Sequence, residues 1–263
     1  MSAAGAPRVV AVHALDADSR AAVRALARAC VPSAATLDVD DAAQARTLLR
    51  SRFVEALLVD VTASPTAATW EVVRLARDFR HAPFVAVTRL WRDDAPALAR
   101  CVACGFAELL IVGVDDAAAR AIVGPRIGSA TFAGATDAAR AALGLDAPLQ
   151  RAAWDRVVAR RGLRVGAGEL SAALGVRRER LSRAFGRDGA PTLKRTIDLV
   201  RVVAAASLLR SPGVRVDDAA RILGVPSASQ LSALARRTVG ISAAGLGRLA
   251  DTELLARFSI AAR

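Results

Sequence analysis

Short β-branched runs alternate five times with amphipathic stretches in the first 125 residues, and this alternation constrains the fold more than any other feature. The runs lie at 8–12, near 36–39, and at 55–61, 83–88 and 108–112. Apolar residues recur at spacings of three and four in the stretches between and after them, at 19–31, 42–52, 66–79, 94–104 and 115–123. Near-continuous apolar runs suit strands buried on both faces, and the longer spacing indicates helices. The sequence therefore predicts an α/β doubly wound, parallel five-stranded sheet whose ligand or reaction site lies at the carboxyl ends of its strands.

The basic charge of the chain is confined to its second part. The chain has 37 basic and 25 acidic side chains, for a net charge of +12. Residues 1–150 hold sixteen of each sign, whereas residues 151–263 hold twenty-one basic and nine acidic side chains. An asymmetry of this kind predicts a polyanionic partner for the second part and a different role for the first.

Several other classes of protein and site are not expected. Charges interrupt every apolar stretch well before the roughly 18 residues of a membrane span, so we expect no membrane partner. Residues 1–7 lack the basic and apolar regions of a secretion signal, and three cysteines cannot all pair, which favours a cytoplasmic location. Cys101 and Cys104 have metal-site spacing, but no second pair follows and the chain has two histidines. We expect two small buried residues there, no metal, no cofactor and no enzyme activity.

Residues 7–125 resemble the receiver domain of two-component response regulators at two points. Asp60 ends the third strand run and is followed by Pro65, one residue later than the family places its proline. Thr88 ends the fourth run, where the family has a hydroxyl. The resemblance implies a receiver or flavodoxin-like fold, with Asp60 as the candidate phosphoacceptor.

Three receiver hallmarks are missing from this sequence. The two acids that the family has after the first strand read His13-Ala14, and Val112-Gly113 lacks the lysine expected after the fifth. Phosphoryl transfer to a carboxylate relies on a hard cation held by oxygens and on positive charge against the phosphate. We therefore expect a pseudo-receiver that takes no phosphate and serves signal input or homodimer formation. The alternative is a working phosphorelay regulator that uses Asp60.

A change in composition divides the chain into domains. Residues 126–147 are rich in glycine and other small residues, which is typical of a connector. We expect a receiver-like domain at 1–125, a linker at 126–147 with a short helix near 137–143, a second domain at 148–250 and a tail at 251–263.

The second domain contains one pattern twice. A short helix, a glycine and a second helix are predicted around Gly175 and again around Gly224, 49 residues later. A long helix is predicted between them, over 192–210. This arrangement follows the logic of a helix-turn-helix, in which glycine adopts the positive φ that ends the first helix. The sequence therefore predicts an all-α domain with two helix-turn-helix motifs.

Residues 150–250 are similar to the AraC/XylS-type DNA-binding domain. The matching residues are Gly175, Leu181, Arg183, Phe185, Arg201, Ala205, Leu208, Leu209, Ala220, Gly224, Ser229, Arg236 and Gly240. The resemblance implies a transcription regulator whose two recognition helices enter successive major grooves of double-stranded DNA, with RNA polymerase as a further partner. The second module departs from the family, with smaller residues at Val225, Leu231 and Ala235 and no proline at Ala243. We therefore expect that module to pack differently or less stably.

The buried stripe of each recognition helix predicts which residues face DNA. The face opposite Leu181 and Phe185 carries the candidate base contacts of the first module, which are Glu179, Ser182 and Arg183. Arginines at its flanks are better placed for phosphates: Arg177, Arg178, Arg180 and Arg187. On the second helix the same construction gives Ser229 and Ser232 for bases and Arg236 and Arg237 for the backbone. We expect the first module to supply most of the base discrimination.

Two other interpretations of these helices stay open. Arginines on the first helix are also compatible with a solvated face, and Glu179 with a pair to Arg183 along the helix. The mostly uncharged second helix is compatible with an adaptor that has lost specific DNA binding and acts through protein contacts.

Overall fold

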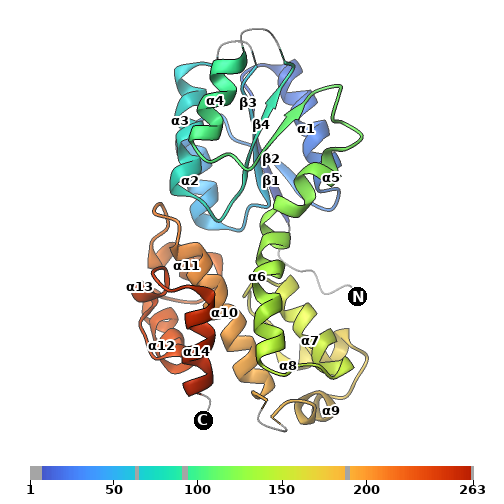
Figure 1. Cartoon of the computed structure of the whole chain (residues 1–263), viewed down its shortest axis with the longest axis vertical. Helices are drawn as coiled ribbons and strands as arrows, with labels where there is room; N and C mark the ends of the chain where they lie inside the picture. The colour runs from blue at the N-terminus through green and yellow to red at the C-terminus, as the bar shows by residue number, and fades with distance from the viewer. Residues whose placement is uncertain (1–7, 63–64, 91–93, 187–189, 262–263) are drawn as a thin grey trace. The chain divides into compact units, whose positions relative to one another are not determined.

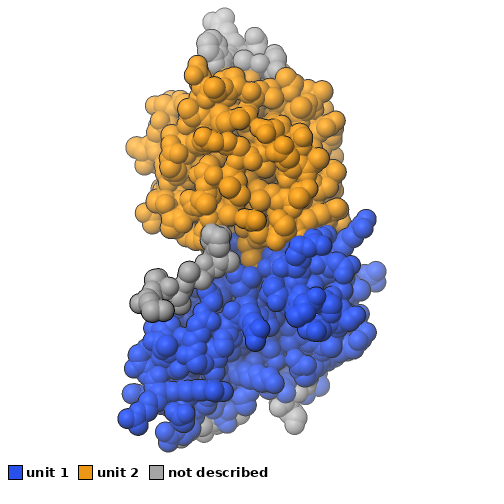
Figure 2. Space-filling model, turned by 180° about the vertical axis from the view of Figure 1, so that it is seen from behind, with its two compact units in different colours: residues 1–6, 132–210, 214–263 blue, residues 7–131, 211–213 orange. Residues whose placement is uncertain are grey.

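The structure is a computed structural model, and it describes residues 8–62, 65–90, 94–186 and 190–261. The chain divides into two compact units (Figure 2). One unit runs to Thr131 and includes residues 211–213, and the other comprises residues 132–210 and 214–263. We describe each unit by itself.

The first unit is built on a five-stranded parallel sheet, as predicted (Figure 1). Its strands are β1 Val9–His13, β2 Ala35–Asp38, β3 Ala56–Asp60, β4 Phe84–Thr88 and β5 Glu108–Ile111. They lie in the order β2-β1-β3-β4-β5, and all four neighbouring pairs are parallel. This is the flavodoxin-like order of a doubly wound sheet, whose direction of winding switches between β1 and β3.

Helices cover both faces of the sheet. They are α1 Ala17–Cys30, α2 Ala42–Ser51, α3 Ala67–Asp78, α4 Ala95–Ala103 and α5 Ala119–Val123, followed by a 3-10 turn at Gly124–Arg126. Helices α1 and α5 lie on one face, and α2, α3 and α4 lie on the other (Figure 1). Val10, Leu58 and Val87 point to the first face and form a fully buried core with Leu26 of α1 and Val123 of α5. Burial on both faces explains why these strands read as continuous apolar runs.

Three helices of this unit begin with a side-chain cap that is visible in the sequence. The carboxylates of Asp16 and Asp41 accept from the N–H groups three residues later, at Ser19 and Gln44, both at 2.8 Å. Thr66 caps α3 in the same way. Each cap satisfies an N–H that the first turn of a helix leaves without an intrahelical partner. They fix the starts of α1, α2 and α3 just after the carboxyl ends of the strands.

The second unit consists of helices, as predicted. After α6 Gly128–Ala142, which bridges the two units, they are α7 Pro148–Ala159, α8 Ala167–Ala173, α9 Arg178–Arg183, α10 Leu193–Leu209, α11 Val216–Ile222, α12 Ala228–Val239, α13 Ala243–Leu246 and α14 Asp251–Ala261. Most of the segment 126–147, predicted as a linker, is therefore helical. The division between the units falls within it, between Thr131 and Phe132.

Residues 251–261, which the sequence places in a tail, form a packed helix. Leu254 and Phe258 of α14 are fully buried, and α14 lies against α10 and α12. The Arg210 guanidinium at the end of α10 donates to the Leu249 carbonyl (2.8 Å) and to the Asp251 carboxylate (2.6 Å). The large apolar side chains of α14 thus join the core around α12, where the second module has small residues of its own.

Among the described residues, no helix is both long enough and apolar enough to cross a bilayer.

Candidate functional site

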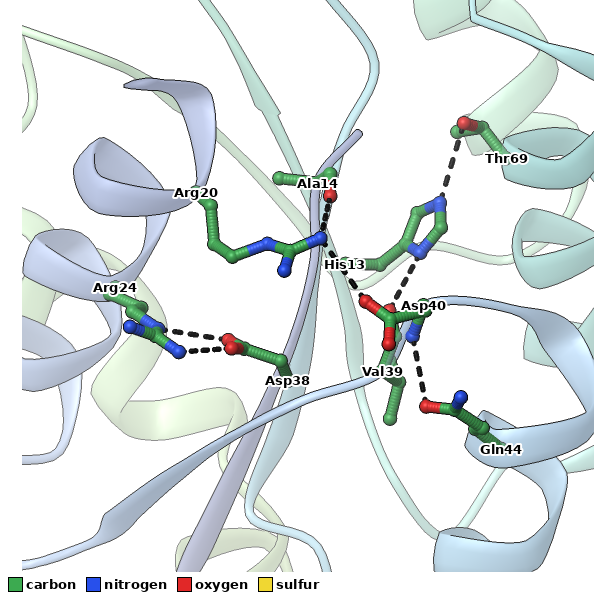
Figure 3. Close-up of polar contacts among 9 residues, drawn as sticks. All are labelled: His13, Ala14, Arg20, Arg24, Asp38, Val39, Asp40, Gln44 and Thr69. Carbon is green, nitrogen blue, oxygen red and sulfur yellow. Dashed lines mark hydrogen bonds and ion pairs between the residues drawn. The ribbon is translucent and has the colours of Figure 1, made fainter. Parts of the chain in front are cut away.

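His13 occupies the carboxyl end of β1, at the switch point of the sheet. Its ring is fully buried, and both ring nitrogens are engaged (Figure 3). Nδ1 lies 2.9 Å from the Val39 carbonyl, which only accepts, so Nδ1 carries the proton. Nε2 lies 3.4 Å from the Thr69 hydroxyl at the start of α3. The imidazole therefore ties β1 to β2 and α3 and offers no free nitrogen to a ligand.

A guanidinium lies beside His13, on the β2 side of this edge. Arg20 of α1 donates from Nη2 to the Ala14 carbonyl (3.0 Å) and to the Asp40 carboxylate (3.1 Å), as Figure 3 shows. The backbone that follows β1 is thus held by an arginine, where the receiver family has acids. The charged group next to the end of β1 is therefore the Arg20 guanidinium, which is paired with Asp40. A cation site would instead need clustered carboxylates.

Asp60 and Thr88 end the neighbouring strands β3 and β4. Asp60 is half-buried, and its Oδ1 accepts from the Thr62 N–H at 2.9 Å. The buried Thr88 hydroxyl donates to the buried Asp94 carboxylate, and it accepts from the Leu90 N–H at 3.0 Å. The hydroxyl that carries part of the receiver resemblance is therefore bonded to a residue beside α4.

The exit of β5 is a tight turn closed by two aspartates. The Ile111 N–H donates to Asp115 (2.7 Å), and the N–H of Gly113, whose φ is +79°, donates to Asp116 (2.9 Å). A glycine in this left-handed conformation stands where the resemblance expects the lysine. The turn adds two carboxylates, both bonded to backbone, and no positive charge.

A divalent cation is what the receiver resemblance implies at this edge, and the residues present do not fit one. Hard cations take several oxygen ligands. At the end of β1 this chain offers an engaged imidazole and an alanine, which leaves Asp60 as the single carboxylate of the family set. In the part of the chain that the structure describes, no group of three or more His, Cys, Asp or Glu side chains is arranged to hold a metal.

The cysteines are free thiols inside the first unit. Cys30, Cys101 and Cys104 are all buried. Burial raises the pKa of Cys30 to about 11 and that of Cys101 to about 12. Both stay protonated near neutral pH, whereas the thiolate is the form that binds metals and attacks disulfides.

The second unit repeats one turn geometry. In the first helix pair, α8 and α9, the Val176 N–H donates to the Ser171 carbonyl at 3.0 Å. In the second helix pair, α11 and α12, the Val225 N–H donates to the Ala220 carbonyl at 2.8 Å. Gly175 and Gly224 have nearly equal φ values of +64° and +63°. The left-handed glycines thus end α8 and α11 in the same way, as the sequence predicts.

The two helix pairs differ after the turn. Arg177 precedes α9 two residues after the glycine, whereas Ser227 precedes α12 three residues after its glycine. The Ser227 hydroxyl accepts from the Gln230 N–H at 3.2 Å, while Arg177 provides no side-chain cap. α9 has 6 residues and α12 has 12. The second pair therefore has the longer and better capped helix despite its smaller core residues.

The predicted contact residues of α9 lie on its surface. Leu181 and Phe185 are buried, as predicted, and the exposed positions are Arg177, Arg178, Glu179, Arg180, Ser182 and Arg183. Arg183 donates from Nε to the Glu179 carbonyl at 3.3 Å, so it is held along its own helix through backbone and not through the Glu179 carboxylate. Arg187 lies outside the described residues.

The predicted contact residues of α12 are also accessible. Leu231 and Ala235 are buried, Ser229, Arg236 and Arg237 are exposed, and Ser232 is half-buried. Arg237 lies 3.7 Å from the Asp198 carboxylate of α10. Sequence reasoning missed this acid, because 18 residues of chain separate its helix from α12 and local periodicity does not show which helices pack together.

Three solved structures are similar to this chain at low identity. A response regulator receiver domain from Rhodospirillum rubrum is 20% identical over 43% of this chain and 89% of its own, with a TM-score of 0.31. A response regulator from Burkholderia pseudomallei with a phosphorylated aspartic acid is 18% identical over 67% and 97%, with a TM-score of 0.35. Full-length FixJ from B. japonicum is 14% identical over 75% and 97%, with a TM-score of 0.38.

No family model and no curated protein matches the sequence.

Proposed function

We propose that this chain is a sequence-specific double-stranded DNA-binding regulator of transcription that acts in the cytoplasm and is not an enzyme. The two helix pairs bind one face of the duplex through α9 and α12, and RNA polymerase is a second partner. The receiver-like unit takes no phosphate and serves signal input or homodimer formation. Base readout falls mainly to Glu179, Ser182 and Arg183.

The repeated turn is the observation that best supports this proposal. Two helix pairs with matching hydrogen bonds and matching glycine φ values, joined by the long helix α10, are what a double helix-turn-helix domain would require, and they support this proposal. Their second helices expose the residues that reach base edges and phosphates in such motifs. The charge of the chain supports the same partner, because the excess of basic residues lies within 151–263.

Phosphorylation of Asp60, or its absence, tests the role of the receiver-like unit. We expect no phosphoryl adduct on the full-length protein after incubation with acetyl phosphate and magnesium, because Asp60 lacks acidic partners and a nearby lysine. Intact-mass measurement checks this, with a working receiver domain treated in parallel as the positive control. An adduct on the wild type that is absent from Asp60→Ala would instead support the phosphorelay alternative.

Arg183 tests base readout by the first helix pair. With a duplex selected from a random pool by the wild-type protein, Arg183→Ala is expected to weaken binding by about 1–3 kcal/mol and to relax preference at one base pair. The reason is that a guanidinium bonds both acceptors of guanine in the major groove. Fluorescence anisotropy with single-base variants of the duplex measures both effects.

Arg237→Ala is the matched comparison on the second helix. It is expected to weaken binding to all duplexes alike and to lower the salt slope by about 1, because a phosphate contact carries no sequence information. Equal loss of base preference in Arg183→Ala and Arg237→Ala would contradict this division between the two helix pairs.

A further inference from the structure

A cleft of about 370 Å³ opens beside the second helix pair, within the all-helical unit. Its walls come from α10, α12, the turn between α11 and α12, and the segment that follows α7. Its charged lining residues are Arg164, Asp198, Arg201 and Arg237. Three guanidinium groups and one carboxylate thus line the cleft, which has an excess of positive charge.

The three arginines are held differently. Arg201 of α10 is half-buried, and its Nε donates to the Gly162 carbonyl at 2.9 Å, which fixes the guanidinium in the wall. Arg237 is paired with Asp198 at 3.7 Å. Arg164 is exposed, and it makes no hydrogen bond or ion pair with any described residue. The single acid is therefore paired with Arg237, and the other two cations have no carboxylate within ion-pair distance among the described residues.

Electrostatics in the cleft favour an incoming anion. Burial lowers the pKa of Arg201, the Asp198 charge raises it, and the nearby Arg164 charge lowers it. An anion bound in the cleft would stabilise the partly desolvated Arg201 guanidinium and offset its repulsion by Arg164. The fork of arginine N–H groups matches the oxygens of phosphate.

The position of the cleft relates it to the proposed DNA-binding face of α12. Gln230, Ala233 and Arg237 of α12 line the cleft. At 3.6 residues per turn, Gln230 and Ala233 each lie about 100° around the helix from the proposed base contacts Ser229 and Ser232. The cleft therefore flanks the proposed base-contacting positions of α12 on one side. A helix in the major groove has a sugar-phosphate backbone along each flank.

We propose that this cleft binds one backbone phosphate of the duplex that α12 contacts, with Arg164 and Arg201 as phosphate contacts outside both helix pairs. The inference rests on the proposed DNA-binding function and deepens it. In this proposal the second module contacts the DNA backbone through α10 and the segment after α7, in addition to the mostly uncharged surface of α12.

Arg164 gives the sharpest test, because it is exposed and its replacement removes no hydrogen bond or ion pair with a described residue. Binding of the full-length protein to a selected duplex and to an unrelated duplex is measured by anisotropy over a range of salt concentrations. Arg164→Ala is expected to reduce the slope of log K against log salt by about 0.9 on both duplexes, which corresponds to one lost phosphate contact. Arg164→Lys is expected to keep the wild-type slope, because the charge remains.

Arg156→Ala is the matched control, since Arg156 is an exposed arginine of α7 that does not line the cleft. A wild-type slope in Arg164→Ala, or equal changes in Arg164→Ala and Arg156→Ala, would overturn the assignment while leaving the DNA-binding function in place. A wild-type protein without measurable duplex affinity would instead overturn the proposed function, and the phosphate cleft with it.

Discussion

Replacement of Gly162 by alanine is expected to destabilise the all-helical unit by about 2–5 kcal/mol, from a strained backbone and an overpacked contact together. Gly162 has a φ of +76°, and an added Cβ would lie 2.6 Å from the Ala204 Cβ and 3.1 Å from the Arg201 Cα. The segment after α7 therefore rests directly on α10, where only glycine fits. Its carbonyl also holds Arg201.

Urea unfolding followed by peptide-level hydrogen exchange measures this loss in each unit separately. The midpoint for peptides of α7 and α10 is expected to fall, and peptides of the sheet are expected to change less. Gly168→Ala is the control, because nothing lies within 4 Å of its added Cβ in α8 and alanine favours helix by roughly 0.5–1 kcal/mol. Equal midpoints for Gly162→Ala and wild type would contradict the close approach.

The second large effect is expected at Glu55, which directly precedes β3 at the amino ends of the strands. Its buried carboxylate accepts from the Arg8 Nε at 3.1 Å and from the Ser129 N–H at 2.9 Å. Its own carbonyl accepts from the Gly128 N–H at 2.9 Å. Arg8 also donates to the Ser129 hydroxyl at 3.0 Å. Glu55 and Arg8 thus hold the first turn of α6 against β1 and β3.

Glu55→Ala is expected to destabilise the first unit by about 2–4 kcal/mol, because it removes the charge-assisted hydrogen bonds from Arg8 and from the half-buried Ser129 N–H, which then loses this acceptor. Thermal unfolding and hydrogen exchange of the α6 peptide report the loss. Glu108→Ala is the matched control: its pair with Arg126, at 3.0 Å, is more exposed, and such pairs contribute roughly 0–1 kcal/mol. Equal shifts for the two variants would mean that Glu55 does not anchor α6.

Periodicity predicted most of the sheet unit from the sequence. Each of the five apolar runs overlaps one strand, and each amphipathic stretch overlaps one helix. Elements buried on two faces and elements buried on one face differ in the period of their apolar residues. Of α6, only the part near 137–143 was predicted, because Gly128, Gly134 and many alanines resemble a connector in composition. α14 was placed in a tail, although Leu254 and Phe258 belong to the core.

Sites formed by residues of one helix were predicted, and sites formed by residues far apart in the sequence were not. The faces of α9 and α12 follow from local period, so Arg183 and Ser229 could be placed on the surface from sequence alone. The cleft could not, because Arg164, Arg201 and Arg237 come from three segments that only the tertiary fold brings together. The partners of His13, Val39 and Thr69, are likewise distant in sequence.

Selection of bound duplexes from a random pool tests sequence-specific DNA binding most directly. The full-length protein is incubated with the pool at near-physiological salt and excess competitor DNA, because a strongly basic region binds any duplex at low salt. The account predicts an enriched motif with two half-sites about one helical turn apart, in which the half-site read by α9 is the more strongly specified. A pool that shows no enrichment while the protein still binds DNA would contradict it and favour an adaptor.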